Sequence, residues 1–493
     1  MANIISEGDI EKALVQKLTM EFGWQTLDCN TLDRNDLNDR SGRADKAEVV
    51  FHDRLRAAAL RLNPTLPSTV IDEALATLTD PRIVLSLIAA NREIDGLLRD
   101  GIPVEYGNAM GRKEHGRVRV IDFAGTAQNE FLVVTQLWIK GDVHWRRPDA
   151  LLYVNGLPLV LVELKNSNIA LRTAYDKNLI DYKKDIPRLF QFNAFILLSN
   201  AVETKVGSLT ASWDFFFSWL RPDDERERVE RKQVEAQRLS LERAAAGLCR
   251  LDRLLDDIEN FVLFSLDTQK IIAQNHQFIG VNRTLEALTH REERNGKLGI
   301  FWHTQGAGKS FSMIFLVRKV FRKLEGSYTF VVITDREDLD SQIYKNFIHT
   351  HTVLDSDAAQ PKNSEQLRQY LTLNKRLVFS LIQKFRFDKG KKYPILSERD
   401  DIIVIVDEAH RTQYKDLAEN MRAGLPNAAY LAFTGTPLPR TNGSATTSAS
   451  TASRSPWRMA RPCRSSTRSA FPKCSFRTMP WIANSPTSTK MKT

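Results

Sequence analysis

The sequence predicts an α/β protein with two folded domains followed by a C-terminal tail that does not fold. Two observations predict the folded part. Continuous apolar strands alternate with helices between residues 256 and 439, the pattern of a buried parallel sheet. Short apolar strands separated by turn residues dominate residues 118–199, within a first domain over residues 1–255. From residue 440 to residue 493 this apolar pattern is absent, which predicts a disordered basic tail.

The first domain is expected to open with an amphipathic helix from Ser6 to Leu18, followed by further helical stretches as far as Arg99. The mixed-sign charges between Asp223 and Arg243 predict a solvated helix or linker near the end of this domain, with a boundary close to residue 255. The expected strands are Val118–Phe123, Glu130–Ile139, Ala150–Val154, Leu157–Leu164 and Ala194–Ser199.

The second domain is predicted from five apolar runs, each short enough for a strand and followed by a helical pattern. Because these runs are apolar throughout, both faces of the sheet are expected to be covered. The runs are Leu298–His303, Phe330–Asp335, Leu377–Ile382, Ile402–Asp407 and Tyr430–Thr434.

Composition sets bounds on function without identifying it. The chain has 493 residues, 42% hydrophobic and 26% charged, as in an ordinary soluble protein. Ten of its 70 Lys and Arg lie in residues 440–493, which contain no Asp or Glu; the remaining 60 equal the 60 Asp and Glu. The net charge of +10 is therefore no sign of DNA binding by the body of the chain.

The cysteine spacing and the hydropathy pattern suggest a location. The four cysteines have neither metal-site nor disulfide-framework spacing, which fits a reducing compartment. No apolar run approaches 18 residues and the first segment is polar, so we expect neither a membrane span nor a signal peptide. A cytoplasmic protein is the expectation.

One constellation of charged residues predicts a metal-dependent nuclease site. Asp149 precedes one apolar strand, and Glu163 and Lys165 end the next strand after the turn Asn155-Gly156. Two carboxylates at a hairpin edge can bind Mg²⁺, while Lys165 positions the attacking hydroxide. A Glu-x-Lys pair is also common as a surface contact, but this strand is otherwise apolar. A third metal ligand is expected from the first helix, either Glu7 or Glu11.

A second constellation predicts a nucleotide site. A Gly-containing loop after the strand that ends at Trp302 leads into a helix, so its backbone amides can bind phosphate groups. Lys309 is expected to neutralise the β- and γ-phosphates, and Asp407 to hold Mg²⁺ with Ser310. Glu408 is expected to orient or deprotonate the attacking water. The predicted nucleotide ligands are Gly306, Gly308, Lys309, Ser310, Asp407 and, for adenine, Gln277.

Two further segments occur in the order required by an ATP-driven motor. Thr334-Asp335-Arg336 ends a strand and is a candidate contact to the DNA backbone, although a structural Asp-Arg pair explains it nearly as well. Thr434-Gly435-Thr436 is a candidate for coupling the nucleotide state to movement, with a simple strand-to-loop turn as the alternative.

Taken in order, these motifs closely resemble the restriction subunit of type I restriction-modification systems over residues 1–438. The resemblance implies a PD-(D/E)xK-type nuclease domain followed by a RecA-like, superfamily 2 helicase-like motor lobe. It also implies ATP and Mg²⁺ as cofactors, double-stranded DNA as substrate, and methylation and specificity subunits as partners. Asn178 departs from the family, which has Gln four residues before Tyr182.

The tail departs from the family completely. Ser444 to Thr451 have the sequence obtained when F-G-D-Y-I-S-I-Y, the type of segment that continues the family motif, is read one base later. Residues 440–493 also contain twenty Ser or Thr and neither Leu nor Val, so they cannot bury a core. We therefore expect a frameshift shortly after Leu438, loss of the second motor lobe and of the docking region, and a polypeptide defective in translocation. The alternative is a genuine basic arm that binds DNA.

Two other functions remain open at this stage. One is a stand-alone DNA-repair nuclease with a motor, which would act without methylation and specificity subunits. The other is a noncatalytic truncated product that titrates its partner subunits.

Overall fold

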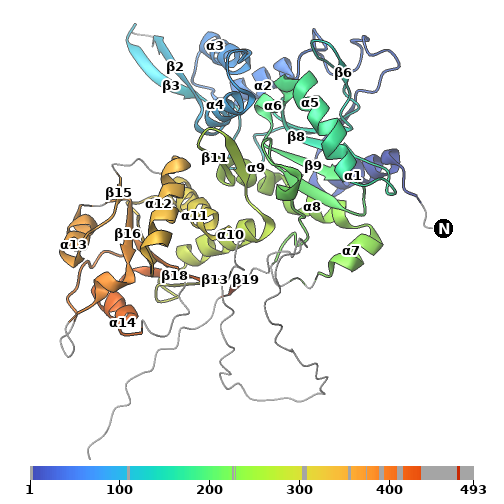
Figure 1. The fold of residues 1–493 in the computed structure, drawn as a ribbon. Coiled ribbons are helices and arrows are strands. Elements are labelled where there is room, and N and C mark those ends of the chain that lie inside the picture. The colour runs from blue at the N-terminus through green and yellow to red at the C-terminus, as the bar shows by residue number, and fades with distance from the viewer. Residues whose placement is uncertain are drawn as a thin grey trace, which may run out of the picture. The chain divides into compact units, whose positions relative to one another are not determined.

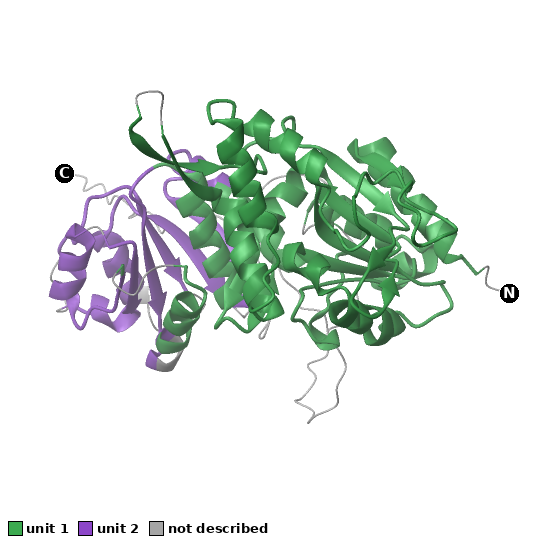
Figure 2. Ribbon diagram, turned by 90° about the horizontal axis from the view of Figure 1, so that it is seen from above, with its two compact units in different colours: residues 1–285, 310–325, 341–357 green, residues 286–309, 326–340, 358–493 purple. Residues whose placement is uncertain are grey.

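The structure is a computed structural model that describes residues 4–107, 111–224, 227, 229–302, 308–352, 357–373, 375–387, 393–407, 415–434 and 475–477. These residues divide into two compact units (Figure 2). Unit 1 comprises residues 1–285, 310–325 and 341–357, and unit 2 comprises residues 286–309, 326–340 and 358–493. The domain boundaries expected at residues 255 and 439 stay predictions, and the first of them falls inside a helix.

Unit 1 is built on a mixed six-stranded sheet in the order β1-β4-β7-β8-β9-β10 (Figure 1). The pairs β1–β4 and β8–β9 are parallel, whereas β4–β7, β7–β8 and β9–β10 are antiparallel. All residues of the central strands β7, β8 and β9 are buried, as their uninterrupted apolar sequences require. The strands are β1 Gln25–Asp28, β4 Phe131–Thr135, β7 Ala150–Val154, β8 Leu157–Leu164, β9 Phe195–Ser199 and β10 Thr204–Gly207.

Helices and small hairpins complete this unit. Helix α1 begins after Ser6, whose side chain accepts from the amide of Asp9, and ends at Gly23 with φ of 80°. The first segments are α1 Glu7–Phe22, α2 His52–Leu62, α3 Ser68–Thr79, α4 Leu87–Asp100, the hairpin β2 Ile102–Gly107 with β3 Lys113–Val118, and the short pair β5 Ile139–Lys140 with β6 Trp145–Arg146. The later segments are the π-helix Ala174–Leu179, α5 Ile180–Asp185, α6 Pro187–Phe192, the 3₁₀ turn Trp213–Phe215, α7 Arg231–Gln237, α8 Ser240–Leu248, α9 Leu251–Asn260 and the hairpin β11 Val262–Ser265 with β12 Gln269–Ile272.

Unit 2 contains a sheet in the order β15-β16-β14-β17-β18-β13-β19. All its pairs are parallel except that of β13 with β19. The strands are β13 Lys297–Trp302, β14 Thr329–Thr334, β15 Ala358–Ala359, β16 Leu377–Leu381, β17 Ile402–Val406, β18 Ala429–Thr434 and β19 Ser475–Arg477. The helices of unit 2 are α13 Ser364–Thr372, the 3₁₀ turn Ile382–Phe385 and α14 Lys415–Gly424. Most residues of α10 Asn275–Thr289, α11 Lys309–Lys323 and α12 Glu337–His349 belong to unit 1.

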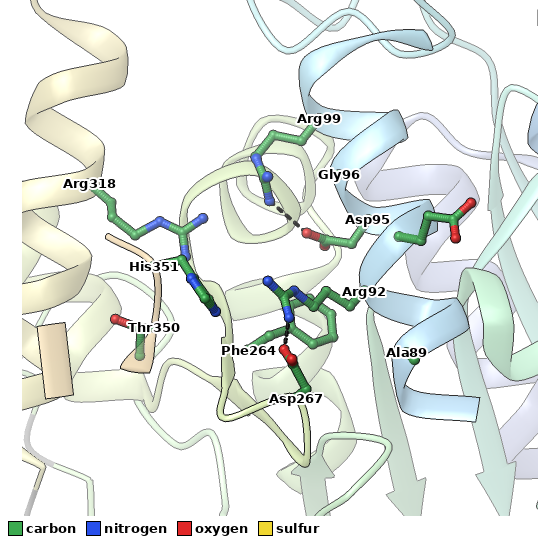
Figure 3. A pocket seen from close by; sticks show the side chains of 11 residues that line it. Ala89, Arg92, Asp95, Gly96, Arg99, Phe264, Asp267, Arg318, Thr350 and His351 are labelled. Carbon is green, nitrogen blue, oxygen red and sulfur yellow. Dashed lines mark hydrogen bonds and ion pairs between the residues drawn. The ribbon is translucent and has the colours of Figure 1, made fainter. Parts of the chain in front are cut away.

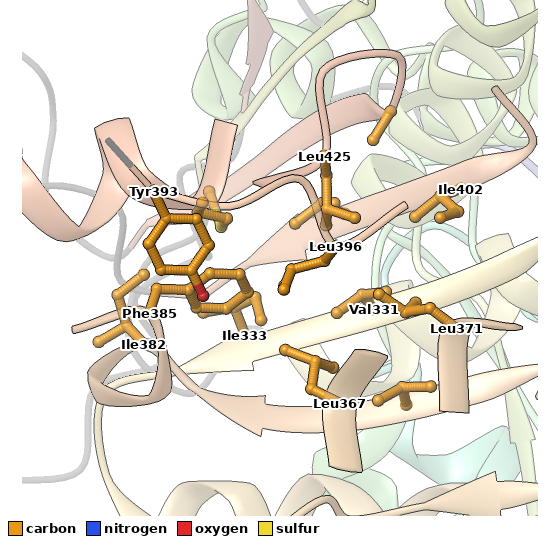
Figure 4. Close-up of a cluster of buried hydrophobic side chains, with 14 residues drawn as sticks. Val331, Ile333, Leu367, Leu371, Ile382, Phe385, Tyr393, Leu396, Ile402 and Leu425 are labelled. Carbon is orange, nitrogen blue, oxygen red and sulfur yellow. The ribbon is translucent and has the colours of Figure 1, made fainter. Parts of the chain in front are cut away.

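One hydrophobic cluster holds the helices of unit 2 against its sheet (Figure 4). Val331 and Ile333 of β14 and Val404 of β17 alternate toward one face of the sheet. Leu367 of α13 and Leu425, just after α14, are buried in the same cluster. The parallel core predicted from the apolar runs is therefore confirmed.

Three sequence-based expectations differ from the structure. Residues 119–123 are not a strand, because β3 ends at Val118 and the amide of Arg119 donates instead to Oδ1 of Asn63. The strand expected over 130–139 is shorter, since Gln136 has φ of 54° and ends β4. In the tail, Ser475–Arg477 form β19, whereas the rest of residues 440–493 lies outside the described residues.

Candidate functional site

The hairpin formed by β7 and β8 creates the first candidate site. Its turn, Asn155-Gly156, has φ of 51° and 80°, as a two-residue hairpin turn requires. The strand pairing of Ala150 with Val162 then places Asp149 opposite Glu163, just beyond the last paired residues. The predicted meeting of these two carboxylates at the hairpin edge thus agrees with the register.

Asp149 is fixed by the backbone of the neighbouring strand. Its Oδ2 accepts a hydrogen bond of 2.7 Å from the amide of Leu164, and its side chain is half-buried. Burial raises the pKa of Asp149, and Glu7 adds to this, against the opposing effects of the Leu164 amide, Lys165 and Arg147. The carboxylate is therefore held in place where its negative charge is poorly solvated.

Glu163 and Lys165 form a buried pair at the end of β8. The Lys165 Nζ donates to Glu163 Oε1 at 2.8 Å and to the carbonyl of Leu164 at 2.7 Å. Burial raises the pKa of Glu163 to about 8, and the nearby charge of Asp149 contributes to the same shift. Burial disfavours the charge of Lys165, but Glu163 and Asp149 outweigh it and raise the Lys165 pKa.

A π-helix follows Lys165 in the sequence after a short loop and continues into α5. It spans Ala174–Leu179, and π-helical turns are frequent at functional sites. Tyr182, one turn into α5, is buried and donates to the carbonyl of Arg147 at 3.4 Å. Burial and the charge of Glu163 raise the Tyr182 pKa, while Asn178 lowers it through a hydrogen bond. Asn178 therefore contacts this site in spite of its shorter side chain.

The two candidate third ligands occupy successive turns of α1. Glu7 Oε1 is 3.9 Å from Lys165 Nζ, and 40% of its side chain is exposed. Glu11 Oε2 accepts from Gln136 Nε2 at 2.5 Å. Burial raises the Glu11 pKa, as do the charges of Asp149 and Asp28. Both glutamates thus face the site, and the choice between them remains a prediction.

Asp28 was missed in the sequence. It ends β1, and its Oδ1 is 3.5 Å from the hydroxyl of Thr135 on β4. The segment Gln25–Asp28 has no apolar run, so neither the strand nor the position of its last carboxylate could be recognised from periodicity.

The donor set of this site fits a divalent cation with oxygen ligands. Glu163 Oε2 is buried and accepts no hydrogen bond from the described residues, although buried polar atoms are normally satisfied. The elevated pKa values of Asp149 and Glu163 likewise reflect negative charge that lacks sufficient compensation. Among the described residues, no group of three or more His, Cys, Asp or Glu is arranged to hold a metal, and metal binding by Asp149 and Glu163 stays a prediction.

The second candidate site lies in unit 2, where two distant segments meet. Strand β13 ends at Trp302, Gly308 has φ of 75°, and α11 begins at Lys309. The Lys309 Nζ is 3.2 Å from Oδ1 of Asp407, which follows β17 and is 7% exposed. The Asp407 amide donates to the carbonyl of Ile333 on the adjacent strand β14. The structure thus brings together the predicted phosphate-binding lysine and the predicted metal-binding aspartate.

Other predicted nucleotide-site residues are only partly described. Gly306 and Glu408 lie outside the described residues, as do Gly435 and Thr436. Ser310 follows Lys309 in the first turn of α11. Gln277 is buried on the first turn of α10, where its Oε1 accepts from the amide of Gln274 at 2.8 Å. Its role in adenine binding remains a prediction.

Asp335 and Arg336 follow β14. Asp335 is buried, and its carbonyl accepts from Gln383 Nε2 at 2.9 Å. The Arg336 Nε is 4.0 Å from Asp335 Oδ2, and most of the Arg336 side chain is exposed. An exposed arginine at the end of a motor strand is compatible with the predicted DNA contact, and the pair with Asp335 is compatible with the structural alternative.

Comparison with known proteins assigns both halves of the chain. Residues 4–215 match the model for the type I restriction enzyme R protein N terminus, and residues 276–452 match the model for the SWI2/SNF2 ATPase. The HindI endonuclease subunit of a type I restriction enzyme from Haemophilus influenzae is 36% identical over 461 residues, covering 88% of this chain and 43% of the relative. The chain belongs to the R (endonuclease) subunit family of type I restriction enzymes.

A second R subunit relative comes from an archaeon. The putative MjaIXP endonuclease subunit of Methanocaldococcus jannaschii is 35% identical over 371 residues, covering 69% of this chain and 34% of the relative. The chain therefore spans less than half the length of these two curated relatives. The family resemblance predicted from the motifs is confirmed.

Among solved structures, the UvsW helicase of bacteriophage T4 matches with 15% identity and a TM-score of 0.28, covering 38% of this chain and 61% of the helicase.

No helix in the described part of the chain is long and apolar enough to cross a membrane.

Proposed function

We propose that this R subunit family member cleaves double-stranded DNA in a Mg²⁺-dependent reaction at Asp149, Glu163 and Lys165, and binds ATP at Lys309 and Asp407 in the first lobe of an ATP-driven DNA motor. The observation that carries the proposal is the hairpin-edge cluster, in which a buried carboxylate oxygen of Glu163 has no hydrogen-bond partner among the described residues. On this proposal the first domain is a PD-(D/E)xK-type nuclease and the second a RecA-like lobe.

Each side chain at the hairpin edge has a separate part in cleavage. Asp149 and Glu163 would hold Mg²⁺, which supplies a water of lowered pKa and stabilises charge on the scissile phosphate. The Leu164 amide keeps the Asp149 carboxylate oriented toward that position. Lys165 keeps a positive charge beside both carboxylates, from which its ammonium can donate to a phosphate oxygen or to the attacking hydroxide.

The side chains of the nucleotide site also have separate parts. In the structure, the charge of Lys309 is compensated by Asp407 at 3.2 Å. The β- and γ-phosphates of ATP would replace Asp407 as the ion-pair partner of Lys309. Asp407 and Ser310 would then be available to hold the accompanying Mg²⁺. Gly308, with its positive φ, lets the backbone amides turn toward the phosphates. Glu408 is proposed as the residue that activates the attacking water.

The proposed partners rest on the family, and the proposed location rests on the cysteines. We propose that methylation and specificity subunits supply recognition of the DNA sequence, as expected from the motif resemblance. A cytoplasmic location is supported by the two described cysteines, Cys29 and Cys249, which are free thiols.

The sequence after Leu438 is proposed to be an out-of-frame translation. The eight residues Ser444–Thr451, which match the shifted family segment, support this proposal. Resequencing the gene from the codon for Leu438 onward is the test: if the alternative reading frame after this codon does not encode the segments that continue the family motif, the frameshift is contradicted.

A plasmid-nicking assay tests the nuclease site. The 493-residue chain should nick supercoiled DNA in Mg²⁺ and not in EDTA, and Asp149→Asn should reduce the rate roughly 10²-fold or more because it removes a charged metal ligand. Glu21→Gln, at an exposed carboxylate on α1, serves as the matched control and should leave the rate unchanged. Equal nicking by the Asp149→Asn chain would refute the assignment.

A further inference from the structure

Unit 1 contains a cavity that neither proposed site uses (Figure 3). Its volume is about 440 Å³, large enough for an anion with bound water or for part of a nucleotide. Helix α4 forms one wall, and α11, the β11–β12 hairpin and the end of α12 contribute the others. The lining residues are Ala89, Arg92, Glu93, Asp95, Gly96, Arg99, Phe264, Asp267, Arg318, Thr350 and His351.

The wall formed by α4 combines arginines with small residues. Ala89, Arg92, Gly96 and Arg99 are spaced three or four residues apart and therefore share one face of the helix. A Cβ atom built on Gly96 meets no atom within 4 Å. The cavity is consequently open at the middle of this helix face, where a longer side chain would enter it.

The carboxylates at the cavity already have arginine partners. Asp95 pairs with Arg99 at 2.6 Å and Asp267 pairs with Arg92. The third carboxylate, Glu93, is 3.1 Å from Arg82 on the loop before α4. Each of these carboxylates therefore forms its ion pair with an arginine other than Arg318.

Arg318 enters the cavity from α11 without such a partner. Its Nη1 donates to the carbonyl of Val262 at 3.4 Å, and no described carboxylate forms an ion pair with it. Figure 3 shows the guanidinium groups of Arg318 and Arg99 directed into the same space. Burial lowers the pKa of Arg318 to about 9, and repulsion from Arg99 and Arg322 adds to this shift, while Asp95 and Asp100 oppose it. The charge of Arg318 is thus compensated only by carboxylates that are ion-paired with Arg99.

We propose that this cavity binds a phosphate group, with Arg318 as its main ligand and Arg99 and His351 at its rim. A guanidinium presents planar, paired donors that match phosphate oxygens, and a buried cation gains most from an anion that replaces its lost solvent. The phosphate can belong to a DNA backbone or to a free phosphate or nucleotide, which share this chemistry. The site is additional to the nuclease and motor sites, and its existence does not depend on either.

Phosphate binding can be isolated from the other two sites in the full chain. The Lys309→Ala variant in EDTA lacks both the phosphate-loop lysine and the metal. In this background, an increase in the thermal unfolding temperature with inorganic phosphate measures phosphate binding in this cavity. Sodium chloride at matched ionic strength is the reference. We expect the apparent phosphate affinity to fall at least fivefold on Arg318→Gln, whereas Arg172→Gln, at an exposed ion-paired arginine, leaves it unchanged.

Position 96 provides a second variant that does not disturb Arg318. Gly96→Glu should place a carboxylate in the open space and lower phosphate affinity at least fivefold, while Gly96→Ala retains it. If Arg318→Gln fails to fold, the pair of variants at position 96 decides. Phosphate stabilisation no greater than that of chloride, or unchanged affinity in Gly96→Glu, overturns the proposal.

A duplex-binding arm distinguishes the two sources of phosphate. In the same Lys309→Ala background and EDTA, the binding of a labelled DNA duplex is followed by fluorescence anisotropy. A loss of at least fivefold in duplex affinity on Arg318→Gln assigns the site to the DNA backbone. Unchanged duplex affinity together with reduced inorganic phosphate affinity assigns it to a free phosphate or nucleotide.

Discussion

Individual buried groups carry most of the chemistry that the structure explains. Glu163 illustrates this, because one carboxylate oxygen is paired with Lys165 and the other accepts no hydrogen bond from the described residues. The sequence indicated both residues from their place at the end of an apolar strand. The sequence could not show that only one of the two oxygens is hydrogen-bonded. That difference depends on how β7, β9 and α5 surround the end of the strand.

The two described thiols should be chemically inert in the folded chain. Burial raises the pKa of both Cys29 and Cys249 to about 12, so almost no thiolate forms at neutral pH. In a Cys463→Ser/Cys474→Ser background, we expect iodoacetamide at pH 8 to label neither thiol in native protein and both in urea, as measured by mass spectrometry. Rapid labelling of Cys249 in the native chain would contradict its buried position.

Lys270 should make stability depend on pH in the alkaline range. Its Nζ is buried and donates to Asn91 Oδ1 at 2.9 Å and to the carbonyl of Asn193 at 2.5 Å. Burial lowers its pKa from 10.5 to about 8, so between these values the unfolded chain binds a proton that the folded chain does not. The contribution of Lys270 to stability therefore rises as the pH increases from about 8 to 10.5, by on the order of 1–3 kcal/mol.

Urea unfolding at pH 7.5 and 9.5 measures this effect. The change in unfolding free energy between these two pH values should be less positive for Lys270→Met than for the parent chain, whereas Lys113→Met, at an exposed lysine, should match the parent. If both variants show the same pH dependence, Lys270 titrates normally in the folded state.

At the scale of secondary-structure elements, the β7–β8 turn determines the geometry of the proposed nuclease site. Gly156 has φ of +80°, and a Cβ atom there would lie 2.5 Å from the carbonyl oxygen of Phe51. Gly156→Ala is therefore expected to destabilise the chain by about 2 kcal/mol or more and to shift the hairpin that carries Asp149 and Glu163. The measurement is urea unfolding of the chain, monitored by far-UV circular dichroism.

The control for this substitution is Gly125→Ala. A Cβ atom at Gly125 meets nothing within 4 Å, and its φ is not in the positive range. Its stability should remain within about 0.5 kcal/mol of the parent chain. A similar loss in both variants would show that the effect is general to glycine replacement.

The elements that sequence patterns predicted well are those with strong apolar periodicity. Five of the six described parallel strands of unit 2, together with β7, β8 and β9, agree with their predicted ranges to within one residue at either end. The sixth, β15, has only two residues and was not predicted. The hairpin β2–β3 was missed because its second strand, Lys113–Val118, is almost entirely polar. Helix α8 was read as part of a solvated charge run, yet Leu241 and Ala244 are buried in it. Such segments are determined by tertiary contacts that no local pattern records.

At the scale of the whole molecule, the two proposed sites should be separable by mutation. The hairpin-edge cluster lies entirely in unit 1, and the pair Lys309–Asp407 lies in unit 2. We expect Glu163→Gln to abolish Mg²⁺-dependent nicking while ATP binding is retained, and Lys309→Ala to abolish ATP binding while nicking is retained. Filter binding of labelled ATP and plasmid nicking measure the two activities on the same preparations.

Loss of both activities in either single variant would contradict this independence. Thermal unfolding of each variant provides the necessary check, because a misfolded chain would also lose both. The sequence motifs sufficed to propose the two sites. The cavity at Arg318 could not have been found in this way, since its lining residues come from α4, α11 and two further segments that are distant in sequence.

The π-helix Ala174–Leu179 makes the chain tolerant of a change in length at one position. A π-turn accommodates one more residue than the α-helical turn it replaces. Deleting a single residue there would restore regular α-helical winding, and the residues on either side would keep their orientation. A deletion within the regular turns of α5 would instead rotate the residues beyond it by about 100°. Natural variation in length should therefore occur in the π-helix and be absent from α5.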